Sequence, residues 1–297
     1  MLLSSDSDSS YPYTIHHEKL SLHLKIVDIN SLFLHEEIIP EMLEKLAKEI
    51  RMDEALRHPV IVDENSFVVL DGMHRVAALK MLNCKRIPAC LVDYKDSSIT
   101  VGAWYRTITS TSSHLADNIL KEIRSLGFRV EEGKVKSVEE IGKNGIVAEV
   151  KTRENSYLIY HAFENLKEAY DYIKAIENRL KLSNFQVDYE TEVDSFRKLQ
   201  EGKIDAIIET PRLSKEEIVK TALSGKVFAH KATRHVIPAR PLNLNVPLQL
   251  LVAPNLSLEE VNEEFRRILM GKRLKMMPAG CRIENRRYEE DVYLFED

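Results

Sequence analysis

The sequence predicts an α+β fold with two domains. Its 297 residues suit one large or two ordinary domains, and a hydrophobic content of 44% is enough for a real core. Along the first hundred residues, short apolar runs and amphipathic stretches follow the order β-β-α-β-β-α-β-β, which is typical of a compact α+β unit. Residues 1–19 are predicted to be a disordered or extended tail, residues 20–106 the first domain and residues 107–297 the second.

The composition of the chain indicates its cellular compartment and the classes of partner that it can bind. Lys and Arg number 42 against 47 Asp and Glu, a net charge of -5, so the chain offers no global attraction for nucleic acid. The opening residues lack the basic and apolar regions of a signal peptide, and no apolar run is long enough to span a bilayer. The 3 cysteines show no metal-ligand spacing and are expected to be reduced thiols. We therefore expect a cytoplasmic protein with neither a membrane nor a nucleic-acid partner.

The elements of the first domain follow from the spacing of its apolar residues. Residues 20–29 alternate apolar and polar side chains as a half-buried strand does, and Pro40 opens a helix whose apolar stripe recurs at helical spacing. The further predicted elements are strands at residues 59–62 and 67–70 joined by a turn, a helix over residues 76–82, and strands at residues 87–92 and 99–104.

The second domain is predicted to be α+β as well. Its expected elements are a helix at residues 113–126, strands at 146–150 and 157–160, a helix at 164–182, a strand at 185–189, a helix at 193–199, a strand at 204–208 and a helix capped by Ser214. Ser214 stands three residues before Glu217, which is the spacing of a capping box. The basic run from Lys272 to Arg287 lacks interleaved aromatic residues and is interpreted as a solvated helix end or loop.

The most unusual stretch is residues 68–75, Val-Val-Leu-Asp-Gly-Met-His-Arg. Apolar, largely β-branched residues end at Asp71 and helical spacing follows, so the chain is predicted to pass from strand to helix at Gly72. The first-turn amides of that helix favour an anion, Gly72 lets the backbone approach a phosphate, and His74 and Arg75 can add donors. The alternative is that Asp71 only caps the helix and that His74 and Arg75 are solvated.

Two further places in the first domain could carry chemistry. Glu36 and Glu37 follow an apolar run and precede the helix at Pro40, where a carboxylate can project into a cleft. The alternative is that both glutamates only complement the helix dipole. Trp104 is the only tryptophan, and it is either a core anchor or the wall of a binding pocket.

A second polar cluster lies far along the chain. Residues 230–235, His-Lys-Ala-Thr-Arg-His, bring Lys231, Thr233, Arg234 and His235 together between apolar flanks and without acidic neighbours. Such a cluster suits a carboxylate or a phosphate, and a solvated basic loop is the alternative. The sequence contains no Walker A pattern, kinase glycine loop, Gly-x-Ser-x-Gly or His-Glu-x-x-His motif, which excludes the common phosphotransfer scaffolds.

Together these motifs carry a family resemblance. The stretch from Leu70 to Arg75, preceded by His35-Glu36 and followed by Trp104-Tyr105, resembles the ParB/sulfiredoxin-like nucleotide-binding domain as it is used by the free serine kinases of archaea and staphylococci. The stretch from Lys231 to Pro238 resembles the Thr-Arg-His segment near the C-terminus of the same family, which ParB-like partition proteins lack. The resemblance spans roughly residues 20–250 in matching order.

The resemblance implies phosphoryl transfer from ADP or ATP to the hydroxyl of free L-serine, with Mg²⁺ as cofactor. The product would be O-phospho-L-serine for serine and cysteine biosynthesis. Glu36 corresponds to the catalytic glutamate of the family, and Asp71 would face the hydroxyl or the metal. Gly72, His74 and Arg75 would hold the nucleotide phosphates.

The same resemblance implies a substrate site made of Trp104, Lys231, Thr233, Arg234 and His235. The reaction would lie in a cleft between the two domains. No residue indicates which of the two donors is used, and the metal ligands are not identified. The family usually reads Asp-Gly-His-His-Arg where this chain has Met73, so any phosphate contact made through that first histidine is missing here.

A ParB-like, nucleotide-dependent DNA-binding regulator is the alternative function. It would need a helix-turn-helix beyond the nucleotide domain and a basic face, and the sequence shows neither clearly. A sulfiredoxin-type reductase is excluded because it needs a cysteine in the turn after the glycine, where this chain has Met73.

Overall fold

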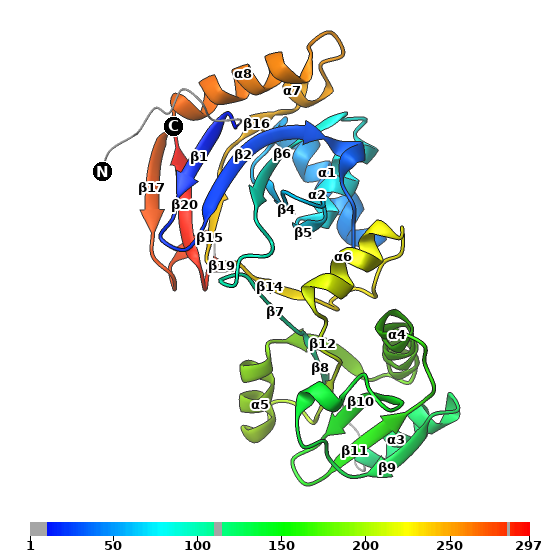
Figure 1. The fold of residues 1–297 in the computed structure, drawn as a ribbon. Coiled ribbons are helices and arrows are strands. Elements are labelled where there is room, and N and C mark those ends of the chain that lie inside the picture. Colours follow the sequence, from blue (N-terminus) through cyan, green and yellow to red (C-terminus); the bar gives the residue numbers. More distant parts are fainter. Residues whose placement is uncertain (1–10, 110–114, 284–285) are drawn as a thin grey trace. The chain divides into compact units, whose positions relative to one another are not determined.

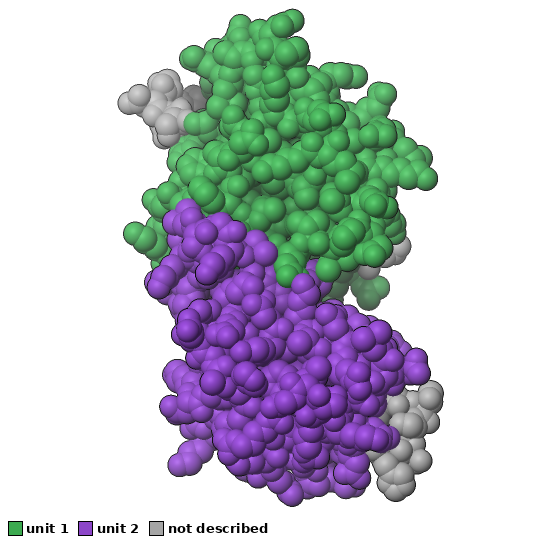
Figure 2. Space-filling model, turned by 90° about the vertical axis from the view of Figure 1, so that its right-hand side faces the viewer, with its two compact units in different colours: residues 1–100, 235–297 green, residues 101–234 purple. Residues whose placement is uncertain are grey.

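The computed structural model describes residues 11–109, 115–283 and 286–297. The chain forms two compact units: unit 1 is residues 1–100 with 235–297, and unit 2 is residues 101–234 (Figure 2). The units differ from the predicted division into 20–106 and 107–297, because the chain returns to unit 1 at His235. Residues 1–10 of the predicted tail lie outside the described residues.

A five-stranded sheet forms the centre of unit 1 (Figure 1). In the spatial order β1-β2-β6-β4-β5 its strands are Tyr13–His16, Ser21–Asp28, Arg86–Val92, Val60–Asp63 and Val69–Asp71. Strands β4 and β6 are parallel, and the other pairs are antiparallel. The predicted alternation of β2 is confirmed, since Leu22, Leu24 and Ile26 are fully buried. Strand β1 lies in the predicted tail but pairs with β2 along its length, with Ile15 buried.

The helices of unit 1 flank this sheet and its C-terminal extension. They are α1 (Pro40–Asp53), α2 (Met73–Met81), α7 (Leu248–Val252) and α8 (Leu258–Met270), with a short 3-10 helix at Ile29–Ser31. Pro40 occupies the first turn of α1 as predicted, where a missing N–H costs nothing. Ala47 and Ile50 form the buried face of that helix.

The C-terminal segment belongs to unit 1 because it adds structure to it. Its strands β15 (Ala239–Leu242), β20 (Asp291–Glu296) and β17 (Arg273–Met277) form a three-stranded sheet. Two separate two-stranded sheets are formed by β16 with β3 (Val246–Pro247 with Ala55–Leu56) and by β18 with β19 (Arg282–Ile283 with Arg286–Arg287). The interpretation of the run from Lys272 to Arg287 as a helix end or loop is therefore wrong. Asn262 of α8 bonds to both the N–H and the carbonyl of Ile26 at 2.8 and 2.9 Å, which attaches α8 to β2.

Unit 2 is built on a six-stranded antiparallel sheet. In the order β12-β8-β13-β10-β11-β9 its strands are Gln186–Glu190, Tyr105–Thr109, Ala206–Glu209, Ile146–Lys151, Ser156–Tyr160 and Arg129–Glu132. Its helices are α3 (Leu115–Ser125), α4 (Leu166–Leu182), α5 (Glu192–Gln200) and α6 (Lys215–Leu223). A 3-10 helix covers Val138–Glu140. The predicted capping box of α6 is confirmed in both of its hydrogen bonds between Ser214 and Glu217.

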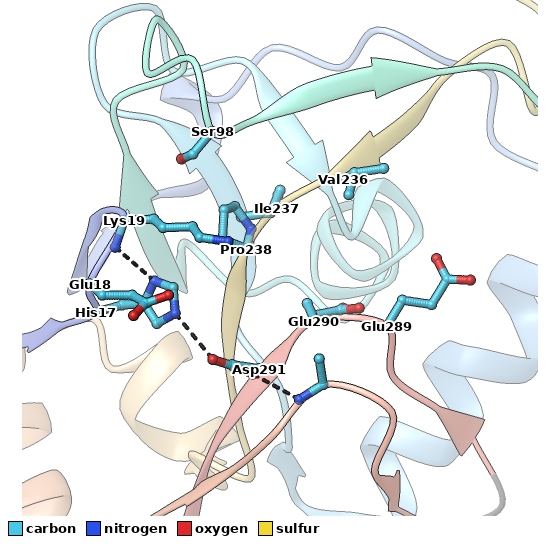
Figure 3. Close-up of a pocket in the computed structure, with 11 residues that line it drawn as sticks. His17, Glu18, Lys19, Ser98, Val236, Ile237, Pro238, Glu289, Glu290 and Asp291 are labelled. Carbon is cyan, nitrogen blue, oxygen red and sulfur yellow. Dashed lines mark hydrogen bonds and ion pairs between the residues drawn. The ribbon is translucent and has the colours of Figure 1, made fainter.

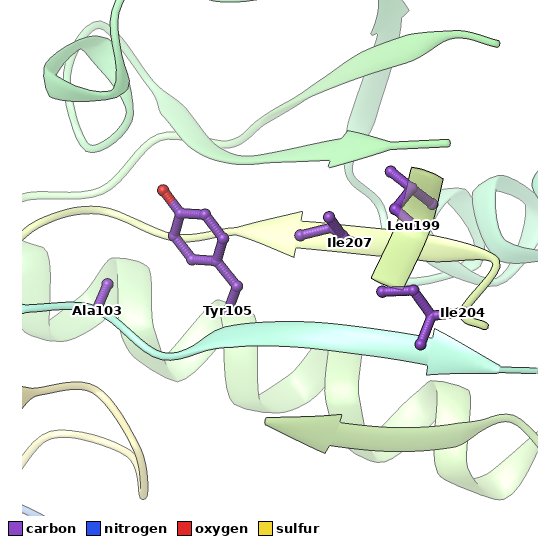
Figure 4. Close-up of a cluster of buried hydrophobic side chains, with 5 residues drawn as sticks. All are labelled: Ala103, Tyr105, Leu199, Ile204 and Ile207. Atoms are coloured by element: carbon purple, nitrogen blue, oxygen red, sulfur yellow. The ribbon is translucent and has the colours of Figure 1, made fainter. Parts of the chain in front are cut away.

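The two faces of the unit 2 sheet hold different side chains. Tyr105 of β8 and Ile207 of β13 pack with Ala103, Leu199 and Ile204 in a buried cluster beside α5 (Figure 4). The next residue of β8, Arg106, points to the opposite face, because side chains alternate along a strand. Strands β7 (Thr100–Gly102) and β14 (Arg234–Val236) pair as a small separate sheet. Within the described part of the chain, no helix has the length and apolar character needed to cross a membrane.

Candidate active site

The predicted change from strand to helix at Gly72 is confirmed. Strand β5 ends at Asp71, and Gly72 is the N-cap of α2 with a left-handed φ of 98° and no side-chain cap. A Cβ atom on Gly72 would lie only 2.7 Å from Nε of Arg75. Glycine is therefore favoured here by the backbone conformation, and a side chain at this position would also displace the guanidinium of Arg75. Asp71 is not the cap of α2, so that alternative is wrong.

Asp71 is held by two arginines, one four residues along the chain and one from β15. Its Oδ2 lies 2.6 Å from Arg75 and 3.2 Å from Arg240 of β15, and Arg240 also pairs with Glu290. Burial alone would raise the pKa of Asp71, but the positive charges of Arg75, Arg240 and Arg286 hold that pKa well below its usual range. Asp71 is therefore an ionised carboxylate and too weak a base to accept a proton near neutral pH.

Glu36 lies on a segment that is fastened to β5 and α2 on both sides. The N–H of Val69 donates to the carbonyl of Phe33 at 2.9 Å, and Nδ1–H of His35 donates to the carbonyl of Val69 at 2.8 Å. Further on, the N–H of Ile39 donates to Nε2 of His74 at 3.1 Å. Glu36 is thereby placed beside the turn between β5 and α2, with only 6% of its surface exposed.

His235 is the one predicted substrate residue that lies in unit 1. Its Nε2 is 2.7 Å from the hydroxyl of Tyr94, and its ring packs edge-on against His35 with 5.2 Å between centroids. Burial lowers the pKa of His35, although the charge of Glu36 and the bond to Val69 oppose this. His35 is accordingly neutral. Its ring contacts that of His235, and Glu36 is the next residue in the chain.

Sequence reasoning missed three contributors to this site: His35 as a structural link, Tyr94 and Arg240. The signal for His35 was its place directly before Glu36. Arg240 stands between Ala239 and Pro241 in a predominantly apolar stretch, and an arginine in such a strand is buried only with a partner. Nothing near Tyr94 in the sequence indicated its role.

The other predicted substrate residues come together in unit 2. Nζ of Lys231 lies 4.4 Å from the ring centroid of Trp104, and Cζ of Arg234 lies 5.8 Å from it. Thr233, between them in the chain, is buried. Trp104 is therefore half-buried under two cations, a surface that combines an apolar wall with positive charge and suits a small carboxylate.

Unit 1 also contains a cavity of about 420 Å³ that includes none of the predicted site residues. Its wall includes His17, Ser98, Pro238, Glu290 and Asp291 (Figure 3). Nε2 of His17 lies 3.2 Å from Asp291 and Nδ1 of His17 accepts from the N–H of Lys19, so the ring is fixed at both nitrogens.

His58 is surrounded by the same arginines as Asp71, among them Arg75 and Arg240. Its Nδ1 accepts a hydrogen bond from the N–H of Asn243 at 3.1 Å. Burial is the main cause that lowers the pKa of His58 to about 4, and the charges of Arg75 and neighbouring arginines add to it. The folded protein thus keeps His58 neutral where the unfolded chain would already be protonated.

His58→Asn is expected to reduce the loss of stability on acidification. Between pH 6.5 and about 4 the unfolded state binds a proton at His58 that the folded state does not, so the free energy of unfolding falls as the pH falls through this window. The asparagine can still accept from Asn243 but does not titrate. Thermal unfolding at pH 7 and pH 5 should show a loss smaller by about 1–2 kcal/mol in the variant. Parallel curves for both proteins would contradict the assignment.

The comparisons with known proteins match the fold described above. The sequence profile of the ParB N-terminal domain matches residues 13–104, which contain the β5–α2 turn and the segment that carries Glu36. Among solved structures, a free serine kinase in complex with AMP superposes with a TM-score of 0.66 at 22% identity, covering 80% of this chain and 97% of that one. The fold is therefore that of a ParB-type domain combined with a second α+β unit, as in a free serine kinase.

Sequence relatives define the family more narrowly. The chain is 34% identical over 236 residues to an ATP-dependent L-serine kinase from Staphylothermus marinus, an alignment that covers 76% of this chain and 90% of the relative. It is 25% identical over 231 residues to an ADP-dependent L-serine kinase from Thermococcus kodakarensis, covering 76% and 91%. The chain belongs to the L-serine kinase family.

Proposed function

We propose that this protein transfers a phosphoryl group from ATP or ADP to the hydroxyl of free L-serine, giving O-phospho-L-serine. The observation that carries the proposal is the buried Glu36, fastened through His35 and Ile39 to the β5–α2 turn. Membership of the L-serine kinase family supports the choice of acceptor. The ParB-like regulator has less support, because an L-serine kinase is 34% identical to this chain, whereas a relative named only as a ParB-like protein is 28% identical.

The chemistry of the proposed reaction assigns one role to each group in unit 1. Glu36 takes the hydroxyl proton of serine while the serine oxygen bonds to the terminal phosphorus, and the bond from that phosphorus to the bridging oxygen of the nucleotide breaks. Gly72 and the first turn of α2, with His74 and Arg75, hold the phosphates. Asp71 orients the hydroxyl or a metal, since its low pKa removes it as a base.

The acceptor is proposed to be held by the second polar cluster. Arg234 and Lys231 bind the serine carboxylate, Trp104 and Thr233 shape the space around it, and His235 contributes from beside His35. Which side chain meets which atom of serine stays a prediction, as does the cleft between the two predicted domains.

Mg²⁺ is proposed to enter with the nucleotide. Among residues 11–109, 115–283 and 286–297, no three metal-ligating side chains lie together. Mg²⁺ is commonly held by only one or two carboxylates plus substrate phosphates, and the ionised carboxylate of Asp71 fits one such ligand. When bound, the metal would neutralise charge on the transferred phosphate.

We further propose that the reaction takes place in the cytoplasm and feeds cysteine biosynthesis. The three cysteines Cys84, Cys90 and Cys281 form no disulfide, as expected of a chain in a reducing compartment.

Phosphorus NMR of the purified protein with Mg²⁺, L-serine and either nucleotide tests the proposal. An O-phosphoserine resonance is expected with at least one donor, together with AMP from ADP or ADP from ATP. If the folded protein forms none with either donor and instead binds duplex DNA with a steep salt dependence, the regulator replaces the kinase.

A further inference from the structure

Arg106 of β8 is a fully buried arginine that neither the family motifs nor the reaction uses. Its guanidinium donates hydrogen bonds to four acceptors within unit 2. Nε pairs with Glu177 of α4 at 2.5 Å, and Nη1 donates to the carbonyl of Trp104 at 2.8 Å. Nη1 also donates to the carbonyl of Lys231 at 3.1 Å, and Nη2 donates to that of His230 at 3.3 Å.

A guanidinium without exposure is costly unless its charge is balanced and its donors are used. Glu177 supplies the balancing charge, and the hydroxyl of Tyr189 donates to the other carboxylate oxygen at 2.7 Å. The charge balance therefore needs only Glu177. The remaining donors of Arg106 reach backbone carbonyls of two separate segments, those of Trp104 and of the loop at His230 and Lys231.

The loop at Lys231 needs this support because its conformation is unfavourable. Lys231 has a left-handed φ of 62°, which costs a residue with a Cβ on the order of 1 kcal/mol or more. Arg106 holds the carbonyl of Lys231. The hydroxyl of Tyr170 lies between the carbonyl of Pro211 at 2.6 Å and that of Ala232 at 3.1 Å, to which it can donate in a bifurcated bond. In this conformation the amine of Lys231 lies over Trp104.

We propose that Arg106 is a positioning residue for the serine subsite. One side chain fixes both Trp104 and Lys231, the apolar wall and the cation of the proposed carboxylate site, without touching substrate. The inference rests on the proposed function. It predicts that disturbing Arg106 weakens the use of serine and leaves the use of the nucleotide unchanged, because the phosphate-binding turn lies in the other unit.

Arg106→Lys is the decisive variant, since an ammonium keeps the charge near Glu177 but cannot reach all four acceptors with one planar fork. The KM for serine is expected to rise about 10- to 100-fold, as for the loss of charged hydrogen bonds, with the KM for the nucleotide within about 2-fold. Arg179→Lys is the matched control, because Arg179 of α4 is another arginine of unit 2 that pairs with a glutamate, Glu122 of α3, at 2.6 Å. It should leave both KM values unchanged.

A measurement without turnover separates this inference from the proposed function. Trp104 is the only tryptophan, so tryptophan emission, excited selectively over that of the tyrosines, reports on this surface. In Arg106→Lys, quenching of Trp104 by acrylamide should increase toward the level of Lys231→Ala, whereas Arg179→Lys should match the wild type. If the wild type makes no phosphoserine, the proposed function fails while quenching still decides the placement of the loop.

A folded Arg106→Lys protein with unchanged serine KM and unchanged quenching would overturn the inference. If that variant does not fold, Tyr170→Phe replaces it, because it removes only the hydroxyl that holds Ala232 and the neighbouring carbonyl of Pro211. A smaller rise in serine KM and in quenching is then expected, and no change in either would reject the role of the anchored loop.

Discussion

Glu36→Gln is expected to lower kcat by about 10²–10⁴-fold with little loss of folding. The change keeps the size and most of the packing of a side chain that is 6% exposed, but it removes the proton acceptor. The hydrogen bonds that place residue 36 come from His35 and Ile39 and stay intact. Steady-state rates and thermal unfolding of the same preparation measure both effects.

Glu37→Gln is the matched control for charge and neighbourhood. Glu37 is more exposed than Glu36, and its charge aids at most the N-terminus of α1, which is worth a few tenths of a kcal/mol in stability. Its turnover should stay close to that of the wild type. Equal losses in both variants, or a dead Glu37→Gln protein, would show that the catalytic carboxylate is misplaced even if the kinase activity is real.

Arg234→Ala is expected to weaken serine binding by about 1.5–3 kcal/mol, which is roughly 10- to 150-fold in affinity. The alanine removes a planar fork that can bind a carboxylate with two hydrogen bonds, and it takes one of two cations from Trp104. Nucleotide binding should be nearly unchanged. Calorimetric titration with each ligand separately gives both numbers.

Arg212→Ala controls for the loss of a positive charge in unit 2. Arg212 is a surface arginine that pairs with Glu192 at 2.8 Å, and such exposed pairs contribute little. Its removal should leave serine affinity unaltered. Should Arg234→Ala behave in the same way, residues 230–235 are a solvated basic loop and not a binding site.

Local chemistry was sufficient to predict most elements up to the helix that follows Ser214, but none of the helices and strands beyond it was predicted. Gly72 and Pro40 gave clear signals for helix starts, because each restricts or frees the backbone at one position. The Ser214 capping box is likewise a matter of four consecutive residues. The β17 strand was missed because a short edge strand rich in Lys and Arg has the composition of a loop.

The candidate site was predictable only in its local parts. Asp71, Gly72 and Arg75 are close in the sequence, so their cluster is visible there. Arg240 meets Asp71 from 169 positions away, and no spacing rule links such residues. Arg106 was missed for a different reason. An arginine in a strand is usually exposed, and the burial of Arg106 depends on an ion pair with Glu177, which is distant in the sequence.

The ion pair between Asp71 and Arg240 can form only late in the synthesis of the chain, after β15 has been translated. Residues 13–104 can begin to fold while unit 2 is still being translated, which at about 5–20 residues per second takes on the order of ten seconds. Until β15 has emerged, the nascent chain has neither Arg240 beside Asp71 nor His235 beside His35. Ribosome-bound intermediates are therefore expected to be inactive towards serine, and activity is expected only after the C-terminal strands have completed unit 1.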